Sequence, residues 1–583
     1  MPESRLSVVS RQHASPMRIV CVLIAIVVFL PGLSCDKVGV TRYYRQGVVV
    51  TVSPLASEIG KDVLMSGGNT FDAAVAVGFA LAVTYPPAGN LGGGGFAVMR
   101  YDSTGEIGAL DFRETAPIAA SRGMFLDSAG EVIENLSTRG ALASGVPGTV
   151  AGLHALWERY GTRPWQDLVT IAARLADSGF IVDRPLAEMF ADYDSSLSAF
   201  EETRGAFLPN GEPPKQGERL IQPDLARTLY AIAADGPAGF YAGPTADSIV
   251  ACMIKYGGLI THADLDGYRP VWRKPLHFTF DSLDVYSMPP PSSGGIIVGQ
   301  ILKLIEPFDF SQMTPRSPEF IHLFCEASRL AFADRSKHLG DPAFFDVPSS
   351  LLDTDYLNER RKLISRDHAG NSADVQPGNP GKYESDATTH FSICDQAGNM
   401  VAITYTLNES FGSGLTVGGA GFLLNNEMDD FAIRPGYANL YGLVGDEANC
   451  VEAGKRMLSS MSPTLVLRDN QPFLVLGSAG GSKIITTVAQ TIINMTRFGM
   501  TPEAAVAAPR IHHQWLPDSL YLEEKGFDKA TIQSLSAYGH QVRERPPYGD
   551  MELIQIDPIG MMTGAADPRR GGSVAGCNAP IVN

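Results

Sequence analysis

The sequence predicts an α+β protein, in which helical and strand patterns occupy different stretches of the 583-residue chain. The region from about 146 to 300 carries apolar residues at the three- and four-residue spacings of helices. From residue 388 onward, short β-branched and aromatic runs separated by turn residues are typical of β-hairpins. A hydrophobic content of 44% supplies enough apolar material for a large core.

The first predicted elements are a strand and two helices. The run Val48–Val52 is β-branched, and Ala56–Ser66 has a helical pattern that ends at Gly67-Gly68. Asn69 or Thr70 can cap the next helix, Phe71–Val83. This second helix is apolar on nearly all faces, so we expect it to be buried.

Glycine-rich stretches separate the next elements. Gly92–Gly95 lacks the spacing of phosphate-binding loops, so we interpret it as a place where backbones pack closely. The stretch 288–295, MPPPSSGG, is a break before a helix. Three helices are predicted in this part of the chain: Ala151–Tyr160, Trp165–Gly179 and Ile296–Ile305.

The stretch Pro348–Asp386 is polar and rich in Pro, Gly, Asp and Asn, with little periodicity after Ile364. These features predict an exposed loop or linker. It ends just before Ala387 and Thr388, so a chain that is cut there could move away.

The first hairpin after this linker joins Phe391–Cys394 to Met400–Thr406. Symmetric pairing about Ala397 in its turn places Thr406 beside Thr388. A hydroxyl at that position could hydrogen-bond a nucleophile, although threonine is also an ordinary strand residue.

The second hairpin joins Thr464–Arg468 to Phe473–Leu476 and leads through 477–482, GSAGGS, into the helix Ile484–Thr496. Glycines just ahead of a helix expose backbone N–H groups at its positive end. Such groups can stabilise the oxyanion of an acyl transfer, although an ordinary strand-to-helix turn has the same pattern.

Thr388 is the candidate nucleophile. If the chain is cut between Ala387 and Thr388, the new α-amine can serve as the base for the threonine hydroxyl. The pKa of such an amine is about 7.7–8.0 in model peptides, so it can accept a proton near neutral pH.

The N-terminus predicts export. Arginines precede the apolar run Ile19–Leu30, and small residues lead to Cys35, as in a signal peptide. We expect residues 1–35 to be an export segment and the protein to be periplasmic or associated with the cell envelope. The alternatives are an uncleaved membrane anchor and a lipid attached to Cys35.

Charge and cysteine content exclude other classes. The net charge of −17, with no basic stripe, argues against binding nucleic acid. The seven cysteines form no CxxC pair and the sequence has no HExxH. We therefore predict no metal and no disulfide framework, and we expect the five cysteines after Cys35 to be buried.

Several motifs in order carry a family resemblance. They include GNLGGGGF (89–96), DFRETAP (111–117), TTHFSICDQAGNMVAITYTLNESFGSG (388–414), LLNNEMDDF (423–431), LYGLVGDEAN (440–449), KRMLSSMSPT (455–464), GSAGGSKIITT (477–487) and ADPRRGG (566–572). Through them the chain, from about Val49 to Arg570, resembles the γ-glutamyltransferase (γ-glutamyltranspeptidase) family of N-terminal nucleophile hydrolases.

The resemblance implies a four-layer αββα sandwich built from a precursor that cuts itself. The large subunit would be 36–387 and the small subunit 388–583, joined as a heterodimer. Thr388 would attack the γ-carbonyl of glutathione or a related compound. The γ-glutamyl group would then pass to water or to an amino-acid or peptide amine, without a cofactor.

The resemblance also assigns roles at the site. Thr406 would support the nucleophile, and Gly480 and Gly481 would form the oxyanion hole. The substrate would be held by Arg113, Ser459 and Ser460 at its α-carboxylate, by Asn408, Glu427 and Asp430 at its α-ammonium, and by Tyr441 in a lid of the bacterial type. His390 and the stretch His512–Trp515 would be mainly structural. Without the resemblance, Glu427, Asp429 and Asp430 would be interpreted as a solvated acidic turn.

Two other functions are considered. A glutaryl-type (cephalosporin) acylase shares the superfamily, but its substrate lacks the α-ammonium and would leave Glu427 and Asp430 unpaired. A non-enzymatic envelope binding protein should have lost the nucleophile, and Thr388 is present. Ser385-Asp386 before the cut departs from the family pattern, which leaves the rate of processing open.

Overall fold

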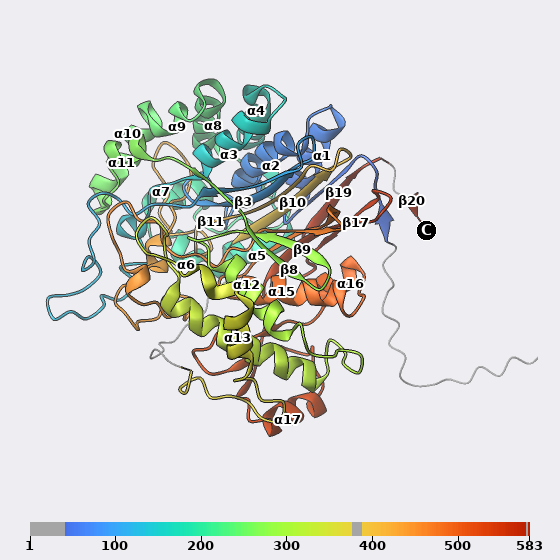
Figure 1. Ribbon diagram of the computed structural model, residues 1–583. Helices are drawn as coiled ribbons and strands as arrows, with labels where there is room; N and C mark the ends of the chain where they lie inside the picture. Colours follow the sequence, from blue (N-terminus) through green and yellow to red (C-terminus); the bar gives the residue numbers. More distant parts are fainter. Residues whose placement is uncertain (1–40, 376–387, 579–580, 583) are drawn as a thin grey trace, which may run out of the picture. The chain divides into compact units, whose positions relative to one another are not determined.

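The computed structural model describes residues 41–375, 388–578 and 581–582. Two antiparallel sheets stack face to face, and helices cover the outer face of each sheet (Figure 1). This order of layers confirms the predicted αββα sandwich. The predicted export segment and Ala387 lie outside the described residues.

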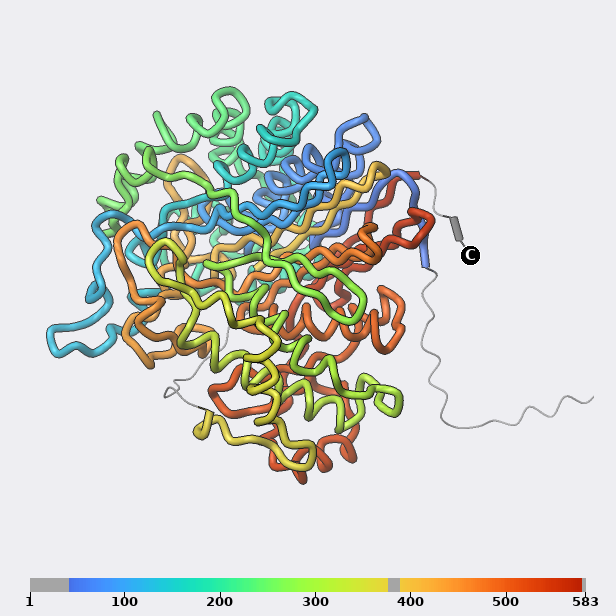
Figure 2. The backbone as a smooth tube through the Cα atoms, viewed as in Figure 1, coloured from blue at the N-terminus to red at the C-terminus, as the bar shows by residue number. Residues whose placement is uncertain are grey.

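The first sheet has seven strands in the order β19-β2-β10-β11-β3-β4-β7. Their bounds are Ser573–Cys577, Gly47–Thr51, Thr389–Asp395, Met400–Thr406, Gly94–Tyr101, Glu106–Phe112 and Val271–Arg273. Figure 2 shows the β10–β11 hairpin beside β2, far away in sequence. The printed pairs Cys394↔Met400 and Ser392↔Ala402 confirm the predicted register.

The second sheet has six strands in the order β18-β17-β13-β12-β9-β8. Their bounds are Met562–Ala566, Asp550–Ile556, Gln471–Ala479, Thr464–Arg468, Leu283–Ser287 and Leu276–Phe280. The β12–β13 hairpin was predicted. The strands β7, β8 and β9 correct the prediction that 146–300 is mostly helical. Smaller sheets pair β1 (Arg42–Tyr43) with β20 (Ile581–Val582), β5 (Phe180–Ile181) with β6 (Arg219–Leu220), and β14 (Ile511–His512), β15 (Leu520–Glu523) and β16 (Val542–Arg545).

The helical layer on the seven-stranded sheet is built around α2 (Thr70–Thr84). Asn69 and Asp72 cap this helix reciprocally, and every residue of α2 is buried, as predicted. The other helices of this half are α1 (Pro54–Met65), α3 (Thr149–Tyr160), α4 (Trp165–Ser178), α5 (Arg184–Asp192), α6 (Asp194–Leu197), α7 (Glu201–Phe207), α8 (Pro223–Asp235), α9 (Ala238–Tyr241), α10 (Gly243–Tyr256) and α11 (His262–Gly267).

The helical layer on the six-stranded sheet contains α12 (Gly294–Ile305), α13 (Pro318–His338) and α15 (Lys483–Thr496), with α16 (Pro502–Ala507) and α17 (Lys529–Ala537) nearby (Figure 1). Sequence reasoning predicted α12 and α15 but missed α13, whose long buried face includes charged residues. Among the described residues, no helix combines the length and the apolar content needed to cross a bilayer. The five described cysteines are buried, as expected.

The glycine run 92–95 permits close contact between backbones, as predicted. A Cβ atom at Gly93 would lie 2.0 Å from the carbonyl oxygen of Thr406, and one at Gly95 would lie 2.4 Å from that of Thr404. Because only glycine fits there, β3 can lie tightly against β11 where the site begins.

The polar segment after Pro348 is more ordered than predicted. It contains the helix α14 (Thr354–Arg361), and its continuation to residue 375 is held against the body of the protein. Ser372 N–H donates to Asp518 Oδ2 (2.9 Å), and the indole N–H of Trp515 donates to the carbonyl of Val375 (2.8 Å). The rest of the predicted linker, 376–386, lies outside the described residues.

Candidate active site

The predicted site residues meet at one narrow cavity of about 20 Å³, which has room for roughly one water molecule. It is lined by Arg113, Thr388, Thr406, Asn408, Glu427, Asp430, Tyr441, Ser459, Ser460, Met461, Gly481 and Ile484. Of the predicted residues that the structure describes, only Gly480 does not line the cavity. Side chains must therefore move apart before a substrate can enter.

Thr388 lies immediately before β10, at the edge where the hairpin opens into the cavity. The last printed pair is Thr389↔Tyr405, so the next step of the same register places Thr388 beside Thr406. Both residues are buried, and the hydroxyl oxygen of Thr406 accepts the N–H of Asn408 at 2.8 Å. This contact fixes the Thr406 side chain next to the candidate nucleophile.

The turn between β13 and α15 carries Gly480 and Gly481 at positive φ angles of 129° and 54°. A Cβ atom on Gly481 would lie 2.5 Å from the ring of Tyr441. Glycine is therefore required for both the backbone conformation and the space. The turn sits at the N-terminus of α15, where backbone N–H groups favour negative charge.

Arg113 follows β4 and is held in a fork by two carboxylates. Its Nη1 lies 2.6 Å from Glu427 Oε2, and its Nη2 lies 2.5 Å from Asp430 Oδ2. Glu114 adds a third carboxylate at 3.6 Å from Nη1. A buried charge cluster of this kind can bind a group that brings both a negative and a positive charge.

Burial and mutual repulsion shift the pKa values in this cluster. Burial raises the pKa of Glu114 to about 7, against the attraction of Arg113. Burial likewise raises the pKa of Glu427 and Asp430 above the ordinary range. For Arg113, burial opposes the charge, but the three carboxylates outweigh it and raise the pKa further. A positive charge added here would keep the carboxylates ionised.

Ser459 and Ser460 lie on a loop that is fixed from behind. Ser293 N–H donates to the carbonyl of Ser459 (2.8 Å), and the loop N–H of Ser459 donates to Pro291 (2.9 Å). Arg335 of α13 donates to Ser293 Oγ (2.9 Å) and to Ser460 Oγ (3.3 Å). Burial lowers the pKa of Arg335 to about 10. Sequence reasoning missed Arg335 because no local pattern distinguishes it from other helix residues.

Asp429 and the stretch 437–443 form a lid over the cavity. Leu440 N–H donates to Asp429 Oδ2 (2.7 Å), and the Asn439 amide donates to Asp430 Oδ1 (2.9 Å). Tyr441 donates its hydroxyl to the carbonyl of Asn408. The interpretation of 427–430 as a solvated acidic turn is therefore wrong: these carboxylates are buried and hold Arg113 and the lid.

Two predicted structural elements also contact the site. His390 is buried between Thr404 Oγ1 (2.8 Å) and Ser392 Oγ (3.0 Å), and burial lowers its pKa to about 3, so its ring is neutral. Gln514, in the stretch His512–Trp515, donates to the carbonyl of Tyr441 (3.1 Å). This stretch therefore supports the lid, which its sequence did not reveal.

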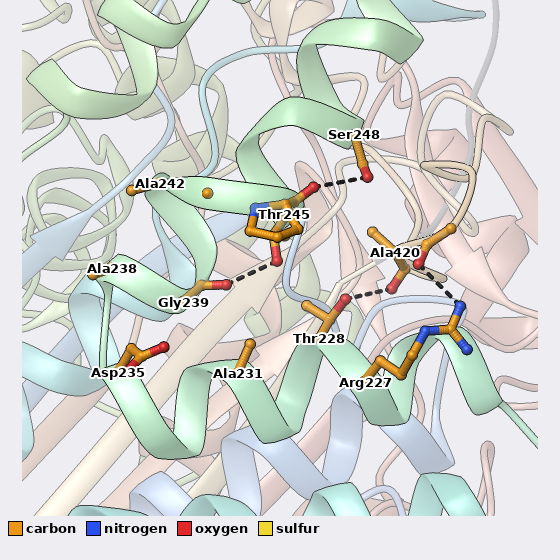
Figure 3. A pocket seen from close by; sticks show the side chains of 13 residues that line it. Arg227, Thr228, Ala231, Asp235, Ala238, Gly239, Ala242, Thr245, Ser248 and Ala420 are labelled. Carbon is orange, nitrogen blue, oxygen red and sulfur yellow. Dashed lines mark hydrogen bonds between the residues drawn. The ribbon is translucent and has the colours of Figure 1, made fainter.

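A larger cavity of about 680 Å³ lies between α8, α9 and α10 and contains none of these residues (Figure 3). Its polar side chains are already bonded within the protein. Thr228 donates to the carbonyl of Ala420 (2.8 Å) and Thr245 to that of Gly239 (2.8 Å). The cavity offers no cluster of reactive groups, so the narrow cavity at Thr388 is the candidate active site.

A threonine at the start of a central strand of an αββα sandwich, facing a glycine turn at a helix N-terminus, defines the N-terminal nucleophile hydrolase class. Comparison with known proteins places the chain within that class. It belongs to the gamma-glutamyltranspeptidase family, whose model matches residues 56–577.

Individual relatives agree with this assignment. The chain is 47% identical over 527 residues to the glutathione hydrolase proenzyme of Escherichia coli (strain K12), covering 90% of each chain. It is 35% identical over 549 residues to the acylase ACY 1 proenzyme of Pseudomonas sp. (strain V22), covering 93% of this chain and 95% of the relative. A cephalosporin acylase structure from Bacillus halodurans aligns with a TM-score of 0.84 at 28% identity, covering 95% of this chain and all of that one.

Proposed function

We propose that this chain is a γ-glutamyltransferase and glutathione hydrolase that activates itself by cutting between Ala387 and Thr388. The observation that carries the proposal is the Arg113–Glu427–Asp430 cluster, which lines the same cavity as Thr388. A nucleophile beside a buried site for one carboxylate and one ammonium matches a γ-glutamyl group, which carries both on its α-carbon.

The cut produces the two subunits, 36–387 and 388–583, and frees the α-amine of Thr388. This amine takes the hydroxyl proton of Thr388 while the oxygen attacks the γ-carbonyl of the substrate. Backbone N–H groups at Gly480 and Gly481 stabilise the oxyanion, and Thr406 orients the nucleophile. The tetrahedral intermediate collapses to a γ-glutamyl ester, and the proton goes to the departing amine.

The second half of the reaction repeats these steps with another nucleophile. Water or the amine of an amino acid or peptide gives its proton to the Thr388 amine and attacks the ester. Glutamate or a new γ-glutamyl product leaves, and Thr388 regains its proton. No step requires a cofactor.

Arg113 binds the α-carboxylate with Ser459 and Ser460, and Asn408, Glu427 and Asp430 bind the α-ammonium. In the structure Arg113 and the two carboxylates are paired with each other. A substrate carrying both charges can replace these contacts without leaving a buried charge alone. Tyr441 then covers the bound γ-glutamyl group.

A comparison of two anilides tests this specificity against the acylase alternative, which the cephalosporin acylase neighbour favours. A γ-glutamyl anilide and a glutaryl anilide differ only by the α-ammonium. We expect the purified enzyme to prefer the γ-glutamyl compound by about 10⁴-fold in kcat/KM, because the glutaryl group leaves Glu427 and Asp430 unpaired. Equal rates, or a preference for the glutaryl compound, would assign the site to an acylase.

The proposal also includes location. The export pattern in residues 1–35 and the relatives' description as proenzymes support a protein that matures in the periplasm or at the cell envelope. Whether residue Cys35 carries a lipid is a separate part of this proposal, and mass spectrometry of the mature large subunit tests it.

A further inference from the structure

A second cluster of reactive side chains lies away from the active-site cavity, between α13 and the end of α17. His322 and Glu326 are four residues apart on α13, so they share one face of the helix. His540 follows α17. One nitrogen or oxygen atom from each of the three residues lies within 4.8 Å of the others, and all three are buried.

The two imidazole rings point at each other. His322 Nδ1 and His540 Nε2 are 2.8 Å apart. The other nitrogen of His322 lies 2.8 Å from the carbonyl of Ser365, which can only accept, so Nε2 carries the hydrogen and Nδ1 presents its lone pair. His540 Nδ1 lies 3.5 Å from Cys325 Sγ. Metal-binding histidines commonly hold their remote nitrogen in this way.

The charges around the cluster also favour a cation. Arg329 pairs with Asp518 through Nη1 and lies 3.2 Å from Glu326 Oε1 through Nη2. Asp518 therefore offsets the charge of Arg329 and leaves the negative charge of Glu326 in excess. The other oxygen, Glu326 Oε2, accepts the N–H of Gly370 at 3.1 Å. A carboxylate has about four lone-pair positions, so these two contacts leave room for a metal ion.

We propose that His322, Glu326 and His540 bind one divalent transition-metal ion, and that zinc is the ion that fits best. Two imidazoles and one carboxylate are a ligand set that zinc accepts, with water in the fourth position. Tetrahedral zinc with Zn–N bonds of about 2.0–2.1 Å places its ligand atoms about 3.3 Å apart. The two rings therefore need to separate by only a few tenths of an ångström.

The ion would join two parts of the mature protein. This consequence rests on the proposed cut: His322 and Glu326 belong to the proposed large subunit and His540 to the small one. Ser365 and Gly370, which contact the same cluster, lie in the last described stretch before the cut. The metal would therefore fasten the end of the large subunit to the small subunit.

The site escaped sequence reasoning because its ligands are far apart. His540 lies 218 residues beyond His322. The patterns searched were CxxC and HExxH, and neither occurs here. An isolated H-x₃-E on a helix is too common to indicate a metal.

Metal analysis of the full chain tests the proposal. The purified protein is freed of metal with a chelator, incubated with zinc, passed through a desalting column and analysed by mass spectrometry for its metal content. We expect about one zinc per chain for the wild type and less than about 0.1 for His322→Ala or His540→Ala. The matched control is His277→Ala, an exposed histidine paired with Asp284, which should keep the zinc.

Two further measurements cover variants that fail to fold and binding elsewhere. Cobalt titration of the wild type needs no variant and should give the strong visible absorption of a tetrahedral ion. Zinc should raise the midpoint of thermal unfolding of the wild type but not that of His322→Ala. Glu427→Gln at the active site should leave zinc content unchanged.

The proposal is overturned if the metal-free wild type takes up less than about 0.1 zinc and shows no cobalt absorption. Zinc retained by both histidine variants would also overturn it. The first result would identify the cluster as a hydrogen-bonded chain from Cys325 through His540 and His322 to Ser365. The uncut variant Thr388→Ala should still bind zinc, so failure of the proposed function and failure of the metal site give different results.

Discussion

Thr388→Ala should leave the protein as one uncut polypeptide and abolish γ-glutamyl turnover. The substitution removes the hydroxyl that attacks the backbone during the cut and the substrate afterwards. Loss of a covalent nucleophile lowers kcat/KM by at least about 10⁴-fold. Denaturing gel electrophoresis and release of the anilide from a γ-glutamyl anilide measure the two effects on the same sample.

The adjacent threonine provides a matched control. Thr389 is also buried, but successive strand residues point to opposite faces, so its side chain points away from the cavity. Its hydroxyl has no hydrogen-bond partner among the described residues. Thr389→Val should therefore be cut and should keep wild-type activity within a few-fold. A Thr388→Ala protein that is still cut and active would remove Thr388 from the mechanism.

Arg113→Met should be the most damaging substitution on the substrate-binding side. Methionine is apolar, so Glu427, Asp430 and Glu114 lose the guanidinium that they surround. Removing one partner of a buried charge cluster costs about 3–5 kcal/mol of folding free energy. We expect this loss in urea unfolding, together with loss of measurable γ-glutamyl binding.

The pH dependence of this loss has a definite sign. Without Arg113, burial raises the pKa of the three carboxyl groups still further above their unfolded values. Such groups hold protons in the folded state, so their penalty is absent below the unfolded pKa of about 4 and grows as the pH rises through the folded values. The deficit of Arg113→Met relative to wild type should therefore be larger at pH 8 than at pH 5, two values chosen to bracket the pKa of about 7 of Glu114.

An exposed ion pair is the control for Arg113. Arg122 and Glu447 form a bridge in which the side chains are 55% and 63% exposed. Arg122→Met should change stability by less than about 1 kcal/mol. Arg113→Lys keeps the charge but not the planar fork, so it should fold better than Arg113→Met and still bind substrate poorly. An Arg113→Met protein as stable and active as wild type would contradict the proposed role.

The hairpin that carries Thr388 could be predicted from local pattern alone. A turn centred on Ala397 and two β-branched runs fix the register, and the structure has that register. The strands β8 and β9 could have been found too, because Leu276, Phe278 and Phe280 alternate with more polar residues. They were missed because the surrounding region has a helical pattern.

The charged part of the site could not be predicted from local pattern. Asp430 lies 317 residues beyond Arg113, and neither residue shows which partner neutralises it. Without that partner, an acidic turn is most simply exposed, and this is why the turn 427–430 was misjudged apart from the family resemblance. Arg335 and the His322–His540 pair depend in the same way on contacts between distant parts of the chain.

The central claim is that Thr388 becomes a chain terminus. Intact-mass spectrometry of the purified protein, after separation under denaturing conditions, tests it most directly. The account predicts a small fragment whose mass corresponds to 388–583, with Thr388 as its first residue, and with Ser385-Asp386 affecting only the rate of its appearance. An active enzyme that consists of uncut chain alone, or whose small fragment begins at any other residue, would contradict the account.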